Sequence, residues 1–256
     1  MSVKKTPASA ESSVEINIAP IRYAEVTVRI IGITPLYMHA MAAKAKRSLL
    51  LGGGKKTAAD RVHIKHDPET EFRDAAYKLE GGPTLLGMMA GAVKSAMATA
   101  ALVTPGMKKT DVQRLIKLPE EFFPVWGKPY LKCDVVRSAD MNRTPDIRTR
   151  PILPQWCGEL RIQFATPHLS PVGIYNLLAN AGNVSGIGDF RQEKGRGHFG
   201  TFLPVVDDEE DQARYAAIVE QARDVQEAAL EAAEPYDTPT RELLAIVRQE
   251  QIRRAA

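Results

Sequence analysis

Two segments in which apolar and polar residues alternate strictly place the strongest constraint on the fold. In residues 24–33, the apolar Val26, Val28 and Ile30 alternate with polar neighbours. Residues 158–165 repeat the pattern with Leu, Ile and Phe at every second position. Because successive side chains of a strand point to opposite faces, this alternation is typical of β-strands with one buried face. The sequence therefore predicts a sheet with one apolar face.

Further segments complete an expected order of β, α, β, β, α, β. They are a Leu/Met/Ala-rich helix at 85–101, β-rich segments at 121–126 and 130–136 that suggest a hairpin across Gly127-Lys-Pro129, a helix capped by Ser170 that ends at Gly182, and a strand at 199–206. This order is that of the ferredoxin-like or RRM-like palm, an α+β fold with a four-stranded antiparallel sheet and two helices on one face.

The remaining sequence divides into an arm, two insertions and a tail. Residues 1–20 are polar without a sustained period, which indicates a flexible N-terminal arm. The palm spans 21–206, with insertions at 39–82 and 128–156, the second containing a Pro/Arg/Asp loop. Residues 207–256 form an acidic tail with two amphipathic helical stripes separated at Pro235. These helices pack either on their own subunit or on a neighbouring copy, and the sequence leaves both open.

Composition excludes several classes of protein. The chain of 256 residues has no apolar run near the roughly 20 residues that a membrane-spanning helix needs, and its N-terminus has no apolar stretch typical of a signal peptide. The two cysteines, Cys133 and Cys157, are too few for a zinc site and fit a reducing compartment. His63 and His66 have a spacing that permits metal binding, but further ligands are missing. We therefore expect a cytoplasmic protein without membrane association, metal or cofactor.

Charge is distributed unevenly along the chain. The net charge is +3, but residues 207–256 carry 13 acidic and 6 basic groups, which leaves 28 basic and 18 acidic groups in residues 1–206. A body of +10 with an acidic tail is common in proteins that bind polyanions, although a solvated surface of mixed charge looks similar.

The segment 186–200 contains five glycines in fifteen residues, interleaved with cations. Glycines allow the backbone to approach a phosphate closely, and amide groups exposed in this way form an anion-binding nest. The spacing does not match a P-loop, so a mononucleotide site is not expected. The alternative is a structural glycine-rich hairpin between helix and strand. If the loop binds phosphate, Gly188→Val and Gly197→Val weaken binding.

Other cations cluster in the two insertions. The loop at 44–65 is strongly basic, and the arginines of the Pro/Arg/Asp loop either contact nucleic acid or pair with Asp134, Asp140 and Asp146. The expected nucleic-acid-binding residues are Lys44, Lys46, Arg47, Lys55, Lys56, Lys94, Arg143, Arg148, Arg150, Gly186, Gly188, Arg191, Lys194, Gly195, Arg196, Gly197 and His198.

Three motifs carry a resemblance to a known family. They are the strand and Pro35-Leu-Tyr-Met-His39 exit at 26–39, the helix start at 83–96, and the glycine-rich loop at 186–200. Together they resemble the RAMP superfamily of CRISPR proteins, in particular its crRNA-binding backbone subunits. The segments 146–151 and 181–194 are also similar to uncharacterised phage-encoded relatives of that family.

The resemblance implies an RRM-like palm, with insertions as fingers and thumb, and copies that assemble head to tail along one nucleic-acid strand. It places the 186–200 loop on the strand's backbone, with Lys94 presented from the neighbouring helix. The segment 130–150 corresponds to a thumb that inserts between nucleotides or reaches the next subunit. The predicted strands lack the aromatic pair of RRM proteins, which favours binding without sequence specificity.

The sequence favours a binding protein over an enzyme. No G-x-S-x-G or H-E-x-x-H motif occurs, and His39 is a lone histidine at a strand exit. We expect an oligomerising protein that coats single-stranded RNA, or single-stranded DNA, as a backbone subunit of a CRISPR-like ribonucleoprotein. The alternatives are a phage annealing or ssDNA-binding recombination protein, and a metal-independent endoribonuclease that uses His39 as a base.

Overall fold

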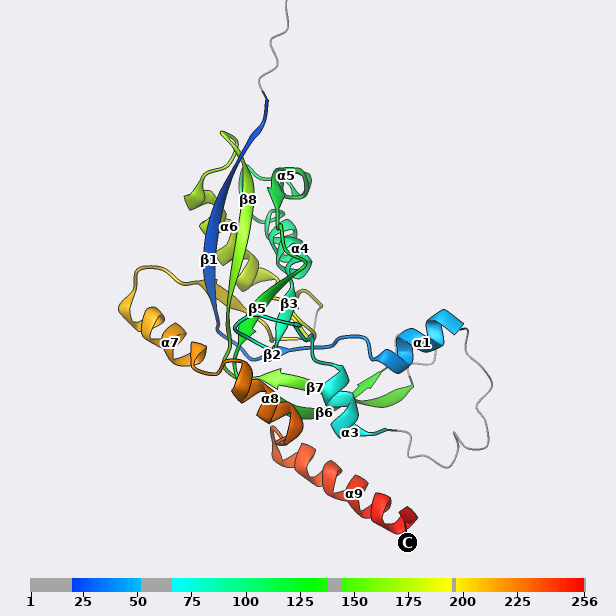
Figure 1. Ribbon diagram of the computed structural model, residues 1–256. Helices are drawn as coiled ribbons and strands as arrows, with labels where there is room; N and C mark the ends of the chain where they lie inside the picture. Colours follow the sequence, from blue (N-terminus) through cyan, green and yellow to red (C-terminus); the bar gives the residue numbers. More distant parts are fainter. Residues whose placement is uncertain (1–19, 52–65, 138–143, 195–196, 256) are drawn as a thin grey trace, which may run out of the picture.

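The computed structural model describes residues 20–51, 66–137, 144–194 and 197–255 (Figure 1). Its main sheet is antiparallel. In spatial order the strands are β3 (Gly87–Met89), β5 (Phe122–Trp126), β8 (Cys157–Thr166), β1 (Arg22–Gly32) and β9 (Phe202–Pro204), and the short β4 (Ile116–Lys117) also pairs with β8.

Two helices cover one face of this sheet. α4 (Ala90–Ala100) precedes β5 in the chain, and α6 (Pro171–Val184) connects β8 to β9. Each alternating strand contributes its apolar residues to the main core, including Val28, Leu160 and Ile162. The order β1, α4, β5, β8, α6, β9 with spatial order β5-β8-β1-β9 is the ferredoxin-like arrangement. The expected α+β palm is therefore confirmed.

The expected hairpin between residues 121–126 and 130–136 is wrong. β6 (Tyr130–Arg137) pairs instead with β7 (Pro145–Leu153) in a second sheet of order β2-β7-β6, in which β2 spans Leu36–Tyr37. Gly127, with φ at +132°, turns the chain away from the main sheet. The segment expected to be a loop contains β7, whose residues 149–153 are buried without alternation and so have no strand signal.

The first insertion packs on this second sheet. α3 (Pro68–Asp74) is capped by Asp67, whose side chain accepts a hydrogen bond from the Thr70 backbone N–H, and the helix contacts β6 and β7. α1 (Ala43–Leu51) projects from the body of the molecule (Figure 1). A further correction concerns residues 87–89, which form strand β3 rather than the start of a helix.

The tail consists of three helices, α7 (Glu209–Val219), α8 (Arg223–Glu231) and α9 (Thr238–Ala255), rather than two. α7 lies on the face of the sheet opposite α4 and α6, where Tyr215 and Ile218 pack with Ile31 and Trp126 in a second apolar cluster. The tail helices therefore pack on the chain's own sheets, in agreement with one of the two alternatives that the sequence left open.

Some expectations fall outside the described residues, including the N-terminal arm except Pro20 and the loop at 52–65 with His63. None of the helices in the described segments combines the length and apolarity that crossing a bilayer requires. Nor do these segments group three or more His, Cys, Asp or Glu side chains in a way that could hold a metal ion. Both cysteines are buried free thiols, and burial raises the pKa of Cys157 to about 12.

Candidate nucleic-acid interface

Three adjoining hollows lie along α4 and meet at Gly91. The first, of about 410 Å³, lies between α4 and the glycine-rich loop and is lined by His39, Ser95 and Arg191. The second, of about 540 Å³, extends to Lys94 and Lys117, and the third, of about 420 Å³, extends to Lys94 and Lys109. We call this continuous depression the α4 cleft.

Gly91 leaves bare backbone where the three hollows meet. A Cβ atom at this position would meet no atom within 4 Å, so packing within the described residues does not require glycine. Gly91 is the second residue of α4, so the bare backbone belongs to the first turn of that helix. A glycine that packing does not require and that faces an open cleft favours close approach by a ligand.

Three lysines line the cleft without carboxylate partners in the described part of the chain. Lys94 donates from Nζ to the backbone oxygen of Gln113 at 3.1 Å. The Nζ of Lys117 lies 3.8 Å from the centre of the Tyr23 ring. Lys109 begins α5 (Lys109–Leu115), which packs against α4. All three ammonium groups therefore remain able to bind an anion.

Most of the acidic residues in the cleft are neutralised by arginines. Glu120 pairs with Arg161 at 2.7 Å. Glu193 pairs with Arg191 at 2.9 Å, and Glu121 is exposed at the rim. Asp189 is bound by the buried Arg150, as described next. The lining therefore contains as many carboxylates as lysines and arginines, but three of the four carboxylates are paired with arginines, whereas the three lysines have no carboxylate partner in the described segments.

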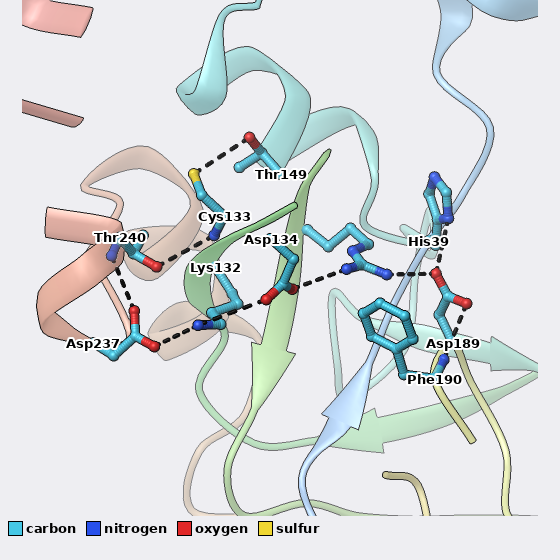
Figure 2. Close-up of polar contacts among 10 residues, drawn as sticks. His39, Lys132, Cys133, Asp134, Thr149, Asp189, Phe190, Asp237 and Thr240 are labelled. Atoms are coloured by element: carbon cyan, nitrogen blue, oxygen red, sulfur yellow. Dashed lines mark hydrogen bonds and ion pairs between the residues drawn. The ribbon is translucent and has the colours of Figure 1, made fainter. Parts of the chain in front are cut away.

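A chain of polar contacts fixes the inner wall of the cleft (Figure 2). The carboxylate of Asp189 contacts His39 Nδ1 at 3.1 Å and Arg150 at 2.6 Å. Arg150 also binds Asp134 at 2.8 Å, and Lys132 continues the chain to Asp237 at the start of α9. The glycine-rich loop is thereby tied to the second sheet and to the tail.

Asp189 remains ionised at neutral pH. The hydrogen bond with His39, followed by the charge of Arg150, holds the pKa of the Asp189 carboxyl well below its ordinary value, against the opposing effect of burial. His39 is 35% exposed and lines the first hollow, so the carboxylate fixes one side of an imidazole that faces the cleft.

The glycine-rich loop uses its glycines mainly for its own packing. Gly188 has φ at +85°, and a Cβ atom there would collide with the carbonyl oxygen of Tyr37. A Cβ at Gly197 would collide with the carbonyl oxygen of Phe190. The same applies to Gly186 against Gly200. Valine at Gly188 or Gly197 would thus disrupt the loop itself, and neither substitution separates binding from folding. The structural alternative for these glycines fits better than direct phosphate approach.

Arg150 does not fit the expected contact with nucleic acid. Its side chain is 1% exposed, and its guanidinium lies between Asp134 and Asp189 and over the rings of Tyr37 and Phe190. A buried guanidinium with two carboxylates has no surface to offer a phosphate. The alternative of internal ion pairs therefore holds for this arginine.

The other expected residues are dispersed. Arg191 and Lys94 lie in the α4 cleft, Lys46 lines a separate hollow beside Tyr77, and Arg148 and His198 are exposed away from the cleft lining. Lys44, Arg47 and Lys194 are placed by their backbone only. The expected residues outside the described segments are Lys55, Lys56, Arg143, Gly195 and Arg196.

Sequence reasoning missed Lys109 and Lys117. Lys109 begins the seven-residue helix α5 and Lys117 lies in β4 just after it, in a stretch without a strong pattern. They reach the cleft only because α5 packs on α4 and β4 pairs with β8. No local signal in the sequence marks this proximity.

The strand order and the covering helices define an α+β protein of ferredoxin-like topology with a cation-lined cleft on α4. A similar solved structure is a chain of the Type III-B Cmr-beta complex bound to cognate target RNA, with a TM-score of 0.37 and 12% sequence identity. The match covers 72% of this chain and 59% of that chain. No protein-family model and no curated protein matches the sequence.

Proposed function

We propose that this protein binds single-stranded nucleic acid, RNA in preference to DNA, along the α4 cleft. In this proposal several copies coat one strand as the backbone subunit of a CRISPR-like ribonucleoprotein. The observation that carries the proposal is the set of lysines without carboxylate partners, Lys94, Lys109 and Lys117, around the bare backbone of Gly91. The motifs that resemble RAMP backbone subunits are consistent with it.

Binding through this cleft would not depend on base sequence. Lysine ammonium groups bind phosphates as point charges and carry no base information. The first turn of α4 also lies in the cleft, and the N-terminal end of a helix favours negative charge. These features together suit a sugar-phosphate backbone.

Charge reversal in the cleft tests the proposal. The double variant Lys94→Glu, Lys117→Glu is expected to bind single-stranded RNA more weakly and to lower the slope of log K against log salt by about 1.4, from about 0.7 per phosphate contact. Fluorescence anisotropy with labelled oligonucleotides at several salt concentrations measures both. The matched control is Arg241→Glu, Arg248→Glu on α9, which changes the net charge equally and should keep the slope of the wild type. Equal slopes in the two double variants would contradict the proposal.

A steric variant provides independent evidence. Gly91→Leu places a side chain in open space, so the fold should persist while the meeting point of the three hollows is filled. We expect weaker binding with a melting temperature no lower than that of the wild type.

The His39–Asp189 pair favours a second candidate function, a metal-independent endoribonuclease. An oriented imidazole beside a cleft can accept the proton of a ribose 2′-hydroxyl. In this function, the protein cleaves single-stranded RNA in EDTA, spares the same strand with 2′-deoxyribose, and loses cleavage but not binding on His39→Gln. RNA that remains intact with the wild-type protein would leave binding as the sole function.

A further inference from the structure

A fourth hollow adjoins the α4 cleft on the other side of Tyr77. It has a volume of about 340 Å³ and is lined by Lys46, Arg73, Tyr77, Lys78 and Phe122 among others. Tyr77 lines both this hollow and the first hollow of the α4 cleft. We call it the Phe122 pocket, and a strand in the cleft could continue into it.

The pocket presents an aromatic pair that no sequence pattern indicates. The ring centroids of Tyr77 and Phe122 are 5.9 Å apart, with an angle of 45° between the rings. The Tyr77 hydroxyl donates to the backbone oxygen of His39 at 3.1 Å, and the Tyr77 carbonyl accepts from the Gly87 backbone N–H at 3.0 Å. Both ends of Tyr77 are therefore held in place.

Phe122 is not required by the apolar core. Its neighbours on β5, Phe123 and Val125, are fully buried in the main core cluster, whereas Phe122 points to the other side of the strand and is only half-buried. A large aromatic ring that lines a pocket without joining the core remains available for stacking.

Three cations line the same pocket as the aromatic pair. Lys46, Arg73 and Lys78 form no ion pair with a carboxylate in the described part of the chain, and the pocket lining contains one acidic residue, Asp74. A flat apolar ligand could stack on the two rings, and negative charges beside it would pair with the three cations. An unstacked nucleobase with its adjacent phosphates has both properties.

We propose that the Phe122 pocket holds one base of the bound strand, stacked on the aromatic pair, at the place where the strand leaves the α4 cleft. This inference rests on the proposed function. Stacking on an aromatic side chain tolerates any base, so the site adds affinity without sequence specificity. The expected contribution is about tenfold in the dissociation constant.

The experiment uses single-stranded oligonucleotides with 2-aminopurine at one position, moved stepwise along the strand. At the position that enters the pocket, we expect quenching by the wild type and by Phe122→Tyr. Phe122→Leu keeps an apolar residue without a ring, so it should lose the quenching and bind about tenfold more weakly with an unchanged salt slope. The melting temperature of each variant reports on its fold.

A second arm uses only the wild-type protein, so it does not depend on the variants folding. Oligonucleotides short enough to fill the binding site in a single register, each with one abasic site at a different position, should bind about tenfold more weakly when the abasic position occupies the pocket. Two results together would overturn the pocket inference: no abasic position weakens binding, and quenching is equal in the wild type and Phe122→Leu. If the oligonucleotides still bind with the salt dependence expected for phosphate contacts, the proposed function stands. If no oligonucleotide binds, the proposed function itself fails.

Discussion

Gln226→Ala is expected to lower the free energy of unfolding by about 3–5 kcal/mol. The side chain of Gln226 on α8 is fully buried. Its Oε1 accepts from the backbone N–H groups of Leu85 and Leu86 at 2.9 and 3.0 Å, and its Nε2 donates to the carbonyls of Val125 and Gly127 at 2.8 and 3.2 Å. Alanine would leave these backbone groups without their hydrogen-bond partner. Each polar group that stays buried without a partner costs about 1–3 kcal/mol.

Urea denaturation followed by circular dichroism measures this loss. Gln212→Ala is the matched control, because Gln212 lies on the surface of α7 with one long side-chain contact of 3.4 Å to the Val206 carbonyl, and we expect a change within about 0.5 kcal/mol. A loss at Gln226 as small as that of the control would mean that α8 does not hold the β3–β5 edge of the main sheet.

The second large effect is expected at Arg150. Arg150→Met keeps a long side chain but removes the guanidinium, so Asp134 and Asp189 lose their shared partner in a partly buried position. Breaking a buried ion pair by removing one partner costs about 3–5 kcal/mol. Adding Asp134→Asn and Asp189→Asn to Arg150→Met removes the two carboxylate charges that Arg150 neutralised and should restore part of the stability. A triple variant no more stable than Arg150→Met would show that the loss comes from packing alone.

The same network gives the stability a dependence on acid. Asp189 has a lowered pKa in the folded state, so its ionised form stabilises the protein above the ordinary aspartate pKa of about 3.9, and this contribution disappears as the pH falls through the folded value. The wild type should lose stability on acidification below about pH 4 more steeply than Asp189→Asn does. Parallel unfolding free energies for the two proteins between pH 5 and pH 2 would contradict this assignment.

The regular elements of the palm were predictable from local pattern. The alternation of apolar and polar residues in β1 and β8 indicates strands with one buried face. The Ser170-Pro171 pair marks the start of α6. β7 was not predictable in this way, because its inner half is buried on both faces and resembles no period. Its prolines and arginines indicated a loop. In the structure this segment is a strand because it pairs with β6, and Arg150 is buried because it pairs with Asp189.

Some residues of the candidate site could be predicted from the sequence, and others could be found only from the structure. Lys94 and Arg191 were identified from the sequence because they belong to a helix and a glycine-rich loop with recognisable patterns. Lys109, Lys117, Tyr77 and Phe122 were not, because their position beside the α4 cleft or in the Phe122 pocket depends on neighbours far apart in the chain. For Arg150 the sequence left nucleic-acid contact and internal ion pairing both open, and tertiary packing decides for the second by burying it between two carboxylates.

By itself, the sequence determined the class of fold, the order of the palm elements and the excess of positive charge in the body, since periodicity and composition are local properties of the chain. Only the tertiary structure decided which cations face an open cleft and which are neutralised inside the protein. Both outcomes use the same residue types, and the difference is whether a carboxylate from a distant segment lies within ion-pair distance.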